Sequence, residues 1–173
     1  MHKLNNKELE KKREDLRKKH KKKIPFFVLL ENIRSLYNVG SVFRTSDACL
    51  VDKIYLAGYT GHPPRKEINK TALGAEEVVP WEYHKDQIAL MKKLKEEGVE
   101  IIVLEQTAGS IPYTEFKPYK PFCLVLGHEV DGVSQKLTDL ADVCVDIPML
   151  GTKQSLNVSV AFGVVAYHLT TDL

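Results

Sequence analysis

Polar and charged residues cluster in segments that directly follow short apolar runs, and each segment is a candidate site of chemistry. The first spans residues 31–48 and surrounds Gly40 with amide, hydroxyl and guanidinium groups, on Asn32, Arg34, Asn38, Arg44 and Thr45. Guanidinium groups and the amides at a helix start both favour negative charge, so this segment suits an oxyanion or a phosphate. One alternative stays open, in which Arg44 pairs with Asp47 and Asn38 only caps a helix.

A second segment, residues 127–134, holds Glu129 between two glycines, directly after the most apolar run. Flanking glycines let a backbone turn tightly and approach a ligand closely. The carboxylate of Glu129 is expected to fix a neighbouring arginine or asparagine, and a role as general base is the less favoured alternative. Asp131 is interpreted as a turn residue.

A third segment, residues 148–159, is the most unusual because polar residues interrupt the chain just before an apolar helix. Ser155 is placed to cap that helix, and Asn157 in its first turn would aim a side-chain amide at whatever lies above the sheet. The alternative is that both residues only cap the helix. A fourth segment, EQTAGS at 105–110, follows another apolar run.

The elements that must position these segments alternate between apolar runs and helical stretches from Pro25 onward, which is typical of α/β proteins. Six strands are predicted, at residues 26–30, 53–58, 78–83, 99–105, 121–127 and 143–148. Helices are predicted at about residues 39–49, 69–75, 86–97, 134–140 and 155–170. The sequence therefore predicts a mostly parallel six-stranded sheet flanked by helices, with ligands beyond the carboxyl ends of its strands.

Fingerprints of several familiar enzyme classes are missing from the sequence. It contains no G-x-G-x-x-G after the first apolar run, no phosphate loop, no H-E-x-x-H and no G-x-S-x-G. A standard dehydrogenase, kinase or hydrolase is therefore not expected, and the six dispersed histidines predict no metal site. The three cysteines, Cys49, Cys123 and Cys144, are predicted to be small buried hydrophobic residues.

Charge is distributed unevenly along the 173 residues, whose 43% hydrophobic content suits one compact domain. Residues 1–23 contain eleven Lys or Arg and four Asp or Glu, a net of +7, so a total of +2 leaves −5 for residues 24–173. Such basic arms supply salt-sensitive binding to phosphate backbones, the alternative being a solvated, frayed extension that only aids solubility. A charged helix or a mobile segment is expected for these residues. Asn5 and Glu8 predict a capping box there. No membrane span or secretory signal is evident, so a cytoplasmic location is expected.

Three ordered signatures in the chain resemble those of the SpoU/TrmH class of SPOUT RNA 2′-O-ribose methyltransferases. They are NIRSLYNVGSVFRTSDA at 32–48, LVLGHEVDGVS at 124–134 and IPMLGTKQSLNVSVA at 147–161. The likeness covers nearly all of residues 24–173. The chain is therefore expected to comprise a basic arm, residues 1–23, and one SPOUT methyltransferase domain, residues 24–173.

The resemblance implies a C-terminal deep trefoil knot, although knotted chains are rare among proteins in general. In the family this knot holds S-adenosyl-L-methionine in a bent shape. The residues that match the family's cofactor positions are Leu104, Gly127, Ile147, Met149, Ser155 and Leu156. Family members work as homodimers that pack the last helix near the active site, which makes Ala161, Val164 and Val165 candidates for either the interface or the core.

The implied reaction is transfer of a methyl group from a sulfonium to a ribose 2′-hydroxyl. In the family, the arginine that matches Arg44 activates this hydroxyl. Because deprotonating an arginine is costly, the alternative is that Arg44 clamps a phosphate that accepts the proton. Asn38, Glu129 and Asn157 would orient Arg44 and the ribose in either version.

Recognition of RNA is expected to depend on basic residues of the domain and of the arm. They are Arg34, Arg44, Arg65, Lys66, Lys18, Lys19, Lys21 and Lys22. The stretch VLEQTA at 103–108 is most similar to family members that act on the guanosine of the tRNA D-loop, so tRNA is the favoured substrate. The alternatives are ribosomal RNA, a catalytically silent RNA-binding paralogue, and a methyltransferase for a protein or small molecule.

Overall fold

A computed structural model describes residues 2–19 and 24–170 of the chain. Its strands are β1 (Phe26–Glu31), β2 (Lys53–Ala57), β3 (Trp81–His84), β4 (Glu100–Leu104), β5 (Ile111–Pro112), β6 (Phe122–Leu126) and β7 (Val143–Asp146). They form one sheet in the order β3-β2-β1-β6-β4-β7-β5, and every neighbouring pair is parallel. The predicted α/β fold with a parallel sheet is confirmed.

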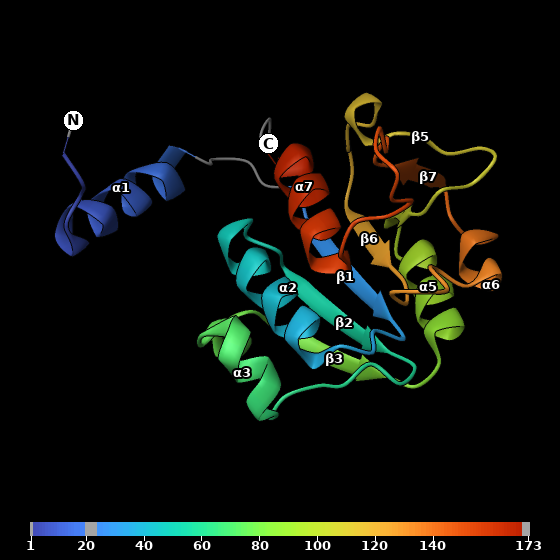
Figure 1. Cartoon of the computed structure of the whole chain (residues 1–173), viewed down its shortest axis with the longest axis horizontal. Helices are drawn as coiled ribbons and strands as arrows, with labels where there is room; N and C mark the ends of the chain where they lie inside the picture. The colour runs from blue at the N-terminus through green and yellow to red at the C-terminus, as the bar shows by residue number, and fades with distance from the viewer. Residues whose placement is uncertain (1, 20–23, 171–173) are drawn as a thin grey trace.

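Helices cover both faces of this sheet (Figure 1). The described residues form the helices α1 (Asn6–Lys19), α2 (Leu36–Ala48), α3 (Lys66–Ala72), α4 (Ala75–Val78), α5 (Gln87–Glu96), α6 (Gln135–Thr138) and α7 (Val158–Thr170), with a 3₁₀ turn at Tyr113–Glu115, and α1 is not among those that cover the sheet. One core lies under α2, α3 and α7, where Val28 and Leu30 of β1 meet Phe43 and Phe162. A second core lies under α5 and α6, where Leu29 of β1 packs with Met91 and Leu137. Because both faces are buried, β1 is a continuous apolar run.

The prediction of six strands is wrong, since the part of the chain that the structure describes has seven. The additional strand, β5, contributes only two residues, which pair with β7 at the end of the sheet. So short a segment carries no alternation of apolar and polar residues that a sequence pattern could reveal.

The region between β2 and β3 also differs from the prediction. In place of one helix at residues 69–75, the structure has α3 and α4, separated by Leu73 and Gly74 with φ angles of +52° and +91°. These left-handed residues stop one helix and start the next. The strand predicted at residues 78–83 therefore begins only at Trp81.

Helix α7 begins at Val158, later than the predicted start at residue 155. The side-chain oxygen of Asn157 accepts a hydrogen bond from the backbone N–H of Ser159 at 2.9 Å. Asn157, and not Ser155, therefore caps the helix, and it lies just before the first turn instead of within it.

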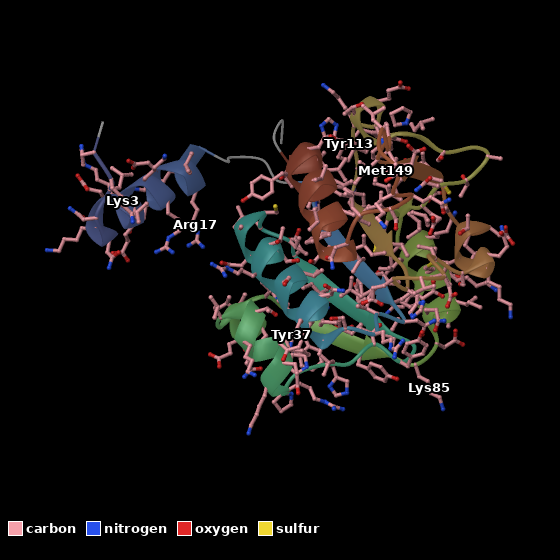
Figure 2. All side chains as sticks on the ribbon, viewed as in Figure 1. Lys3, Arg17, Tyr37, Lys85, Tyr113 and Met149 are labelled. Atoms are coloured by element: carbon pink, nitrogen blue, oxygen red, sulfur yellow. The ribbon has the colours of Figure 1, made fainter. Side chains whose placement is uncertain are left out.

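Helix α1 lies apart from the rest of the described chain in Figure 1. Its start is a capping box, because Asn5 N donates to Glu8 Oε2 at 2.8 Å and Glu8 N donates to Asn5 Oδ1 at 3.1 Å. In Figure 2 the side chains of Lys3 and Arg17 project from this segment. The predicted capping box and charged helix are confirmed for residues 6–19.

The three cysteines are free, and the prediction that they are buried is confirmed for Cys49 and Cys123 and wrong for Cys144. Cys49 and Cys123 are buried, and burial raises the pKa of the Cys49 thiol to about 11. Cys144 is only half-buried, beside the core under α5. Within residues 2–19 and 24–170, no cluster of histidine, cysteine or carboxylate side chains suits a metal ion, and no helix is long and apolar enough to cross a membrane.

Helix α2 approaches α3 closely at Gly40. A Cβ added there would collide with Thr71 Oγ1 and with the backbone oxygen of Ile68. On the neighbouring helix α7, Gly163 has more room, since a Cβ at that position would have Thr45 Cγ2 as its nearest atom, at 4.0 Å. The two glycines thus differ in packing while sharing a helical backbone.

Gly40→Ala is expected to lower the free energy of unfolding by about 1–3 kcal/mol, because overpacking outweighs the gain of about 1 kcal/mol in helix propensity. The matched control, Gly163→Ala, is expected to raise it by about 0.5–1 kcal/mol. Urea unfolding followed by circular dichroism measures both changes. Equal effects of the two substitutions would contradict the packing argument.

Candidate functional site

A cavity opens at the carboxyl ends of β4, β6 and β7, where the segments singled out in the sequence meet. All six residues that match cofactor positions of the resembling family line it: Leu104, Gly127, Ile147, Met149, Ser155 and Leu156. Figure 2 shows Met149 on the segment that joins β7 to α7. Residues from four separate parts of the chain therefore share one cavity.

The cavity combines apolar walls with carboxylates. Leucine and isoleucine side chains line it together with Glu105, Asp131 and Asp146. Asp146 accepts a hydrogen bond from the Ser110 hydroxyl at 2.6 Å. A Cβ at Gly127 would collide with the backbone that follows it at Gly132, so this wall is bare main chain. Such a lining suits a ligand that carries both an apolar ring system and positive charge.

Glu129, at the cavity wall, fastens its loop to the start of α2. Its carboxylate accepts hydrogen bonds from Arg34 N at 3.0 Å, Ser35 N at 3.0 Å and Asn38 Nδ2 at 2.9 Å. The helix cap is Ser35, whose hydroxyl accepts from Asn38 N at 3.4 Å. The alternative in which Asn38 only caps the helix is therefore wrong, and the negative charge of Glu129 is favourably placed at the N-terminus of α2.

These contacts decide the charge of Glu129. Burial alone would raise the pKa of its carboxyl, but the hydrogen bonds from Ser35, Arg34 and Asn38 together outweigh burial and hold that pKa below its usual value. A carboxylate with a lowered pKa is a weak proton acceptor at neutral pH. The geometry favours the predicted role of fixing a neighbouring asparagine over the role of general base.

Asn157 extends this arrangement to α7. Its Nδ2 donates to Asn38 Oδ1 at 3.1 Å, while its Oδ1 accepts from Ser159 N and, at 2.7 Å, from Ser159 Oγ. Asn157 thus caps α7 and reaches α2 at the same time. Glu129, Asn38 and Asn157 form one hydrogen-bonded row, called here the Glu129–Asn38–Asn157 row, at the edge of the cavity.

Two further carboxylates, which the sequence analysis does not single out, hold the 127–134 loop. Glu105 Oε2 accepts from Val133 N at 2.9 Å, and Glu31 Oε2 accepts from Ser134 N at 2.8 Å. Glu31 is only 1% exposed, which is rare for a glutamate without such partners. A carboxylate directly at the end of a buried apolar run is the pattern that would have identified both.

Arg44 lies outside the Glu129–Asn38–Asn157 row. It is exposed on α2 and, six residues after Asn38, its side chain points about 120° away from that of Asn38 around the helix. Arg44 instead borders a shallow hollow with Leu73 and Val78. The alternative pairing is not seen either, since no ion pair joins Arg44 to Asp47 in the described chain.

The basic residues expected to contact RNA are exposed. Arg34 follows β1, and Arg65 and Lys66 lie where the loop after β2 enters α3. Because neighbouring parallel strands end at the same edge, the segments that lead to these residues leave the sheet at the edge where the cavity opens. Lys18 is exposed on α1, whereas Lys21, Lys22 and the side chain of Lys19 lie outside the described residues.

The three candidates for interface or core on α7 have different surroundings. Val165 is fully buried in the core, Ala161 lines the cavity, and Val164 is 36% exposed. Val164 forms a stripe of exposed apolar side chains with Val160, four residues earlier on α7, and with Leu156, which lies two residues before the helix begins. Side chains at this spacing lie on one side of a helix, next to the cavity.

Comparison with known proteins supplies the family. The SpoU rRNA Methylase family matches residues 25–167, which is most of the chain. The chain belongs to this family. A relative named tRNA (guanosine(18)-2′-O)-methyltransferase, from Aquifex aeolicus, is 33% identical over 163 residues, which cover 94% of this chain and 75% of that protein.

Solved structures of the SpoU family share the fold. The TrmH/SpoU tRNA modifying enzyme of A. aeolicus superposes with a TM-score of 0.80 at 30% identity. The match covers 94% of this chain and 83% of the A. aeolicus chain. The AdoMet-bound rRNA methyltransferase of Sinorhizobium meliloti gives a TM-score of 0.82 at 27% identity over 91% of this chain, which spans 60% of that one.

Replacing Glu129 tests the role of its charge in this SpoU family member. Glu129→Gln is expected to lower the free energy of unfolding at pH 7 by about 1–2 kcal/mol, because a side-chain amide accepts fewer of the backbone hydrogen bonds. The pKa of Glu129 in the folded state lies below its unfolded value of about 4.3, so ionised Glu129 stabilises the fold above that pH. This stabilisation is lost as the pH falls through the lowered pKa. The difference between the two proteins should therefore stay constant above about pH 5 and narrow below about pH 4.3.

Urea unfolding at a series of pH values measures this difference. The control is Glu96→Gln, an exposed site on α5, which is expected to change stability by less than about 0.5 kcal/mol throughout. A gap between wild type and Glu129→Gln that widens on acidification would contradict the assigned charge.

Proposed function

We propose that this chain is an S-adenosyl-L-methionine-dependent RNA methyltransferase that modifies a ribose 2′-hydroxyl, with a tRNA guanosine as the favoured target. One observation carries the proposal: the six residues that match cofactor positions line a single cavity, and the Glu129–Asn38–Asn157 row lies at its edge. The name of the A. aeolicus relative supports the tRNA guanosine. Ribosomal RNA is the second candidate, supported by the S. meliloti enzyme.

The residues around the cavity fit S-adenosyl-L-methionine. The adenine ring would lie against apolar walls such as Leu104 and Ile147, and the bare backbone at Gly127 offers hydrogen-bonding groups at close range. The carboxylates of Glu105 and Asp146 suit the positive charges of the cofactor. When bound, the cofactor supplies a methyl group on a positively charged sulfur.

Side chains of this chain would then orient the acceptor. The carboxamides of Asn38 and Asn157 can hydrogen-bond a ribose, and Glu129 holds Asn38 in place. Arg44 is exposed, and a guanidinium presents a fork of N–H donors that matches a phosphate, so clamping an RNA phosphate fits this residue better than acting as a base. In this version the clamped phosphate helps to accept the proton of the hydroxyl.

A homodimer through α7 and a knotted C-terminus complete the proposal. The stripe of Leu156, Val160 and Val164 supports an interface, because exposed apolar side chains in a row beside a ligand cavity favour a partner. Gln106 Nε2 donates to Gln154 O at 2.6 Å, so the segment before α7 passes beside the loop after β4. Helix α7 then returns to pack beside α2, a path that supports threading.

The arm, residues 1–23, and the domain, residues 24–173, are proposed as the two parts of the chain. The arm would add sequence-independent contacts to the RNA backbone, in line with its net charge of +7. A cytoplasmic location stays a prediction.

Methyl transfer is tested with purified protein, labelled S-adenosyl-L-methionine, and separate pools of unmodified tRNA and ribosomal RNA. The expected product is 2′-O-methylguanosine in tRNA, identified by mass spectrometry after digestion. Label only in ribosomal RNA would keep the chemistry and change the target. No label in either pool, with cofactor binding intact, would contradict the proposal and favour a silent paralogue or another acceptor.

Arg44→Ala is expected to lower the rate of methylation about 100-fold, because it removes the group proposed to clamp the phosphate that helps to accept the proton. The affinity for S-adenosyl-L-methionine, measured by calorimetry, should stay unchanged because Arg44 lies away from the cavity. Lys92→Ala, an exposed charge on α5, is the control. Wild-type rates for Arg44→Ala would remove this residue from the site.

A further inference from the structure

Aromatic rings continue from the cavity toward the open edge of the sheet, and the proposed reaction uses none of them. His128 lines the cavity, and the ring of Tyr59 meets it edge-on with centroids 6.2 Å apart. Tyr59 is 62% exposed, so most of its ring faces solvent. It occupies the loop after β2, on the cavity side of the sheet.

The rings continue past Tyr59 along β3. The Tyr83 hydroxyl donates to Gly58 O at 2.7 Å, and the ring of His62 lies 5.2 Å from that of Tyr83. His62 also stacks on Trp81, with centroids 5.7 Å apart and planes at 21°. Together Tyr59, His62, Trp81 and Tyr83 are called here the aromatic strip, and it ends at β3, the edge strand of the sheet (Figure 1).

Hydrogen bonds to the end of β1 and to the residues that follow it fix the backbone that carries the strip. Tyr59 N donates to Asn32 Oδ1 at 3.1 Å. The buried hydroxyl of Thr60 accepts from Ile33 N and donates to Leu30 O, both at 2.9 Å. The backbone of this loop is therefore fixed while the rings of Tyr59 and His62 are exposed. Exposed aromatic side chains on a fixed backbone bind partners at low entropic cost.

Positive charge borders the strip. Arg65 and Lys66 come three and four residues after His62 in the chain. Figure 2 shows Lys85 projecting from the segment after β3, two residues after Tyr83. The nearby carboxylate of Glu82 is neutralised by Lys53, at 2.6 Å. Aromatic rings flanked by lysine and arginine are the arrangement that binds single-stranded nucleic acid, because bases stack on the rings while the cations contact phosphates.

We infer that the aromatic strip is a stacking platform for unpaired bases of the RNA substrate, next to the nucleotide that enters the cavity. This inference rests on the proposed function and deepens it. A platform of this kind selects RNA whose bases are unstacked, such as a loop, and tolerates different base sequences because every base has a π-face. Tyr59, between the cavity and the rest of the strip, would take the base closest to the reacting ribose.

The test compares Tyr59→Ala and His62→Ala with the full-length wild type, using the RNA pool that the wild type methylates. RNA affinity is measured by filter binding over a range of salt concentrations. Loss of one stacked base is expected to weaken binding about 5- to 100-fold. The slope of log affinity against log salt should stay the same, because no phosphate contact is lost.

Three controls separate stacking from other effects. Tyr59→Phe keeps the ring and should bind RNA like the wild type. Tyr119→Ala removes a tyrosine that is 75% exposed at the opposite, amino end of the sheet, before β6, and should leave affinity unchanged. Affinity for S-adenosyl-L-methionine should be the same in all variants, which also shows that they are folded.

Several results would overturn the inference. RNA affinity that is unchanged in both Tyr59→Ala and His62→Ala, with methylation by the wild type intact, would refute the platform and leave the proposed function standing. A shallower salt slope in these variants would assign the strip an electrostatic role instead. A change in molar mass by light scattering would make the strip a contact between copies of the chain. A wild type that binds no RNA would refute both proposals.

Discussion

The candidate site depends on carboxylates that bind backbone amides of the 127–134 loop and of the start of α2. This loop has little regular structure, a single bridge between His128 and Gly132, so its N–H groups need other partners. Glu31 and Glu105, at the ends of two buried strands, supply them from beneath. Glu129, within the loop, binds in turn to the start of α2. Charged acceptors make such hydrogen bonds stronger than neutral ones, which is why a loop can form a cavity wall.

The same carboxylates explain why an acidic domain can serve an RNA enzyme. Glu31, Glu105 and Glu129 direct their negative charge toward backbone amides, and Asp146 directs its charge toward a cavity that suits a cation. Arg34, Arg65 and Lys66 lie outside the cavity, on segments that leave the sheet at the edge where it opens. A polyanion would therefore meet positive charge before it meets the acidic interior, and the basic arm would add to this attraction.

The sequence predicts the parts of this protein that depend on local pattern. The apolar runs of β1 and β6 are strands because both sides of each are buried, and this burial leaves a continuous hydrophobic pattern. Helix α7 shows the limit, since Ser155 and Asn157 are both good caps and only tertiary contacts decide between them. The bond from Asn157 to Asn38 joins residues 119 apart, which no local pattern reveals. Only the likeness to a family placed these residues together in advance.

Arg44 shows what one copy of the chain leaves incomplete. Asn38 and Arg44 lie on the same helix but on different sides of it, so both cannot face the same cavity within one copy. If both act on one ribose, either the RNA bends around α2 or a second copy supplies its own Arg44. Helix α7, which carries the exposed residues Val160 and Val164, lies beside α2, and a partner packed on α7 would bring a second α2 close to the cavity. The proposed homodimer would then be a requirement of the chemistry as well as a way to bury apolar surface.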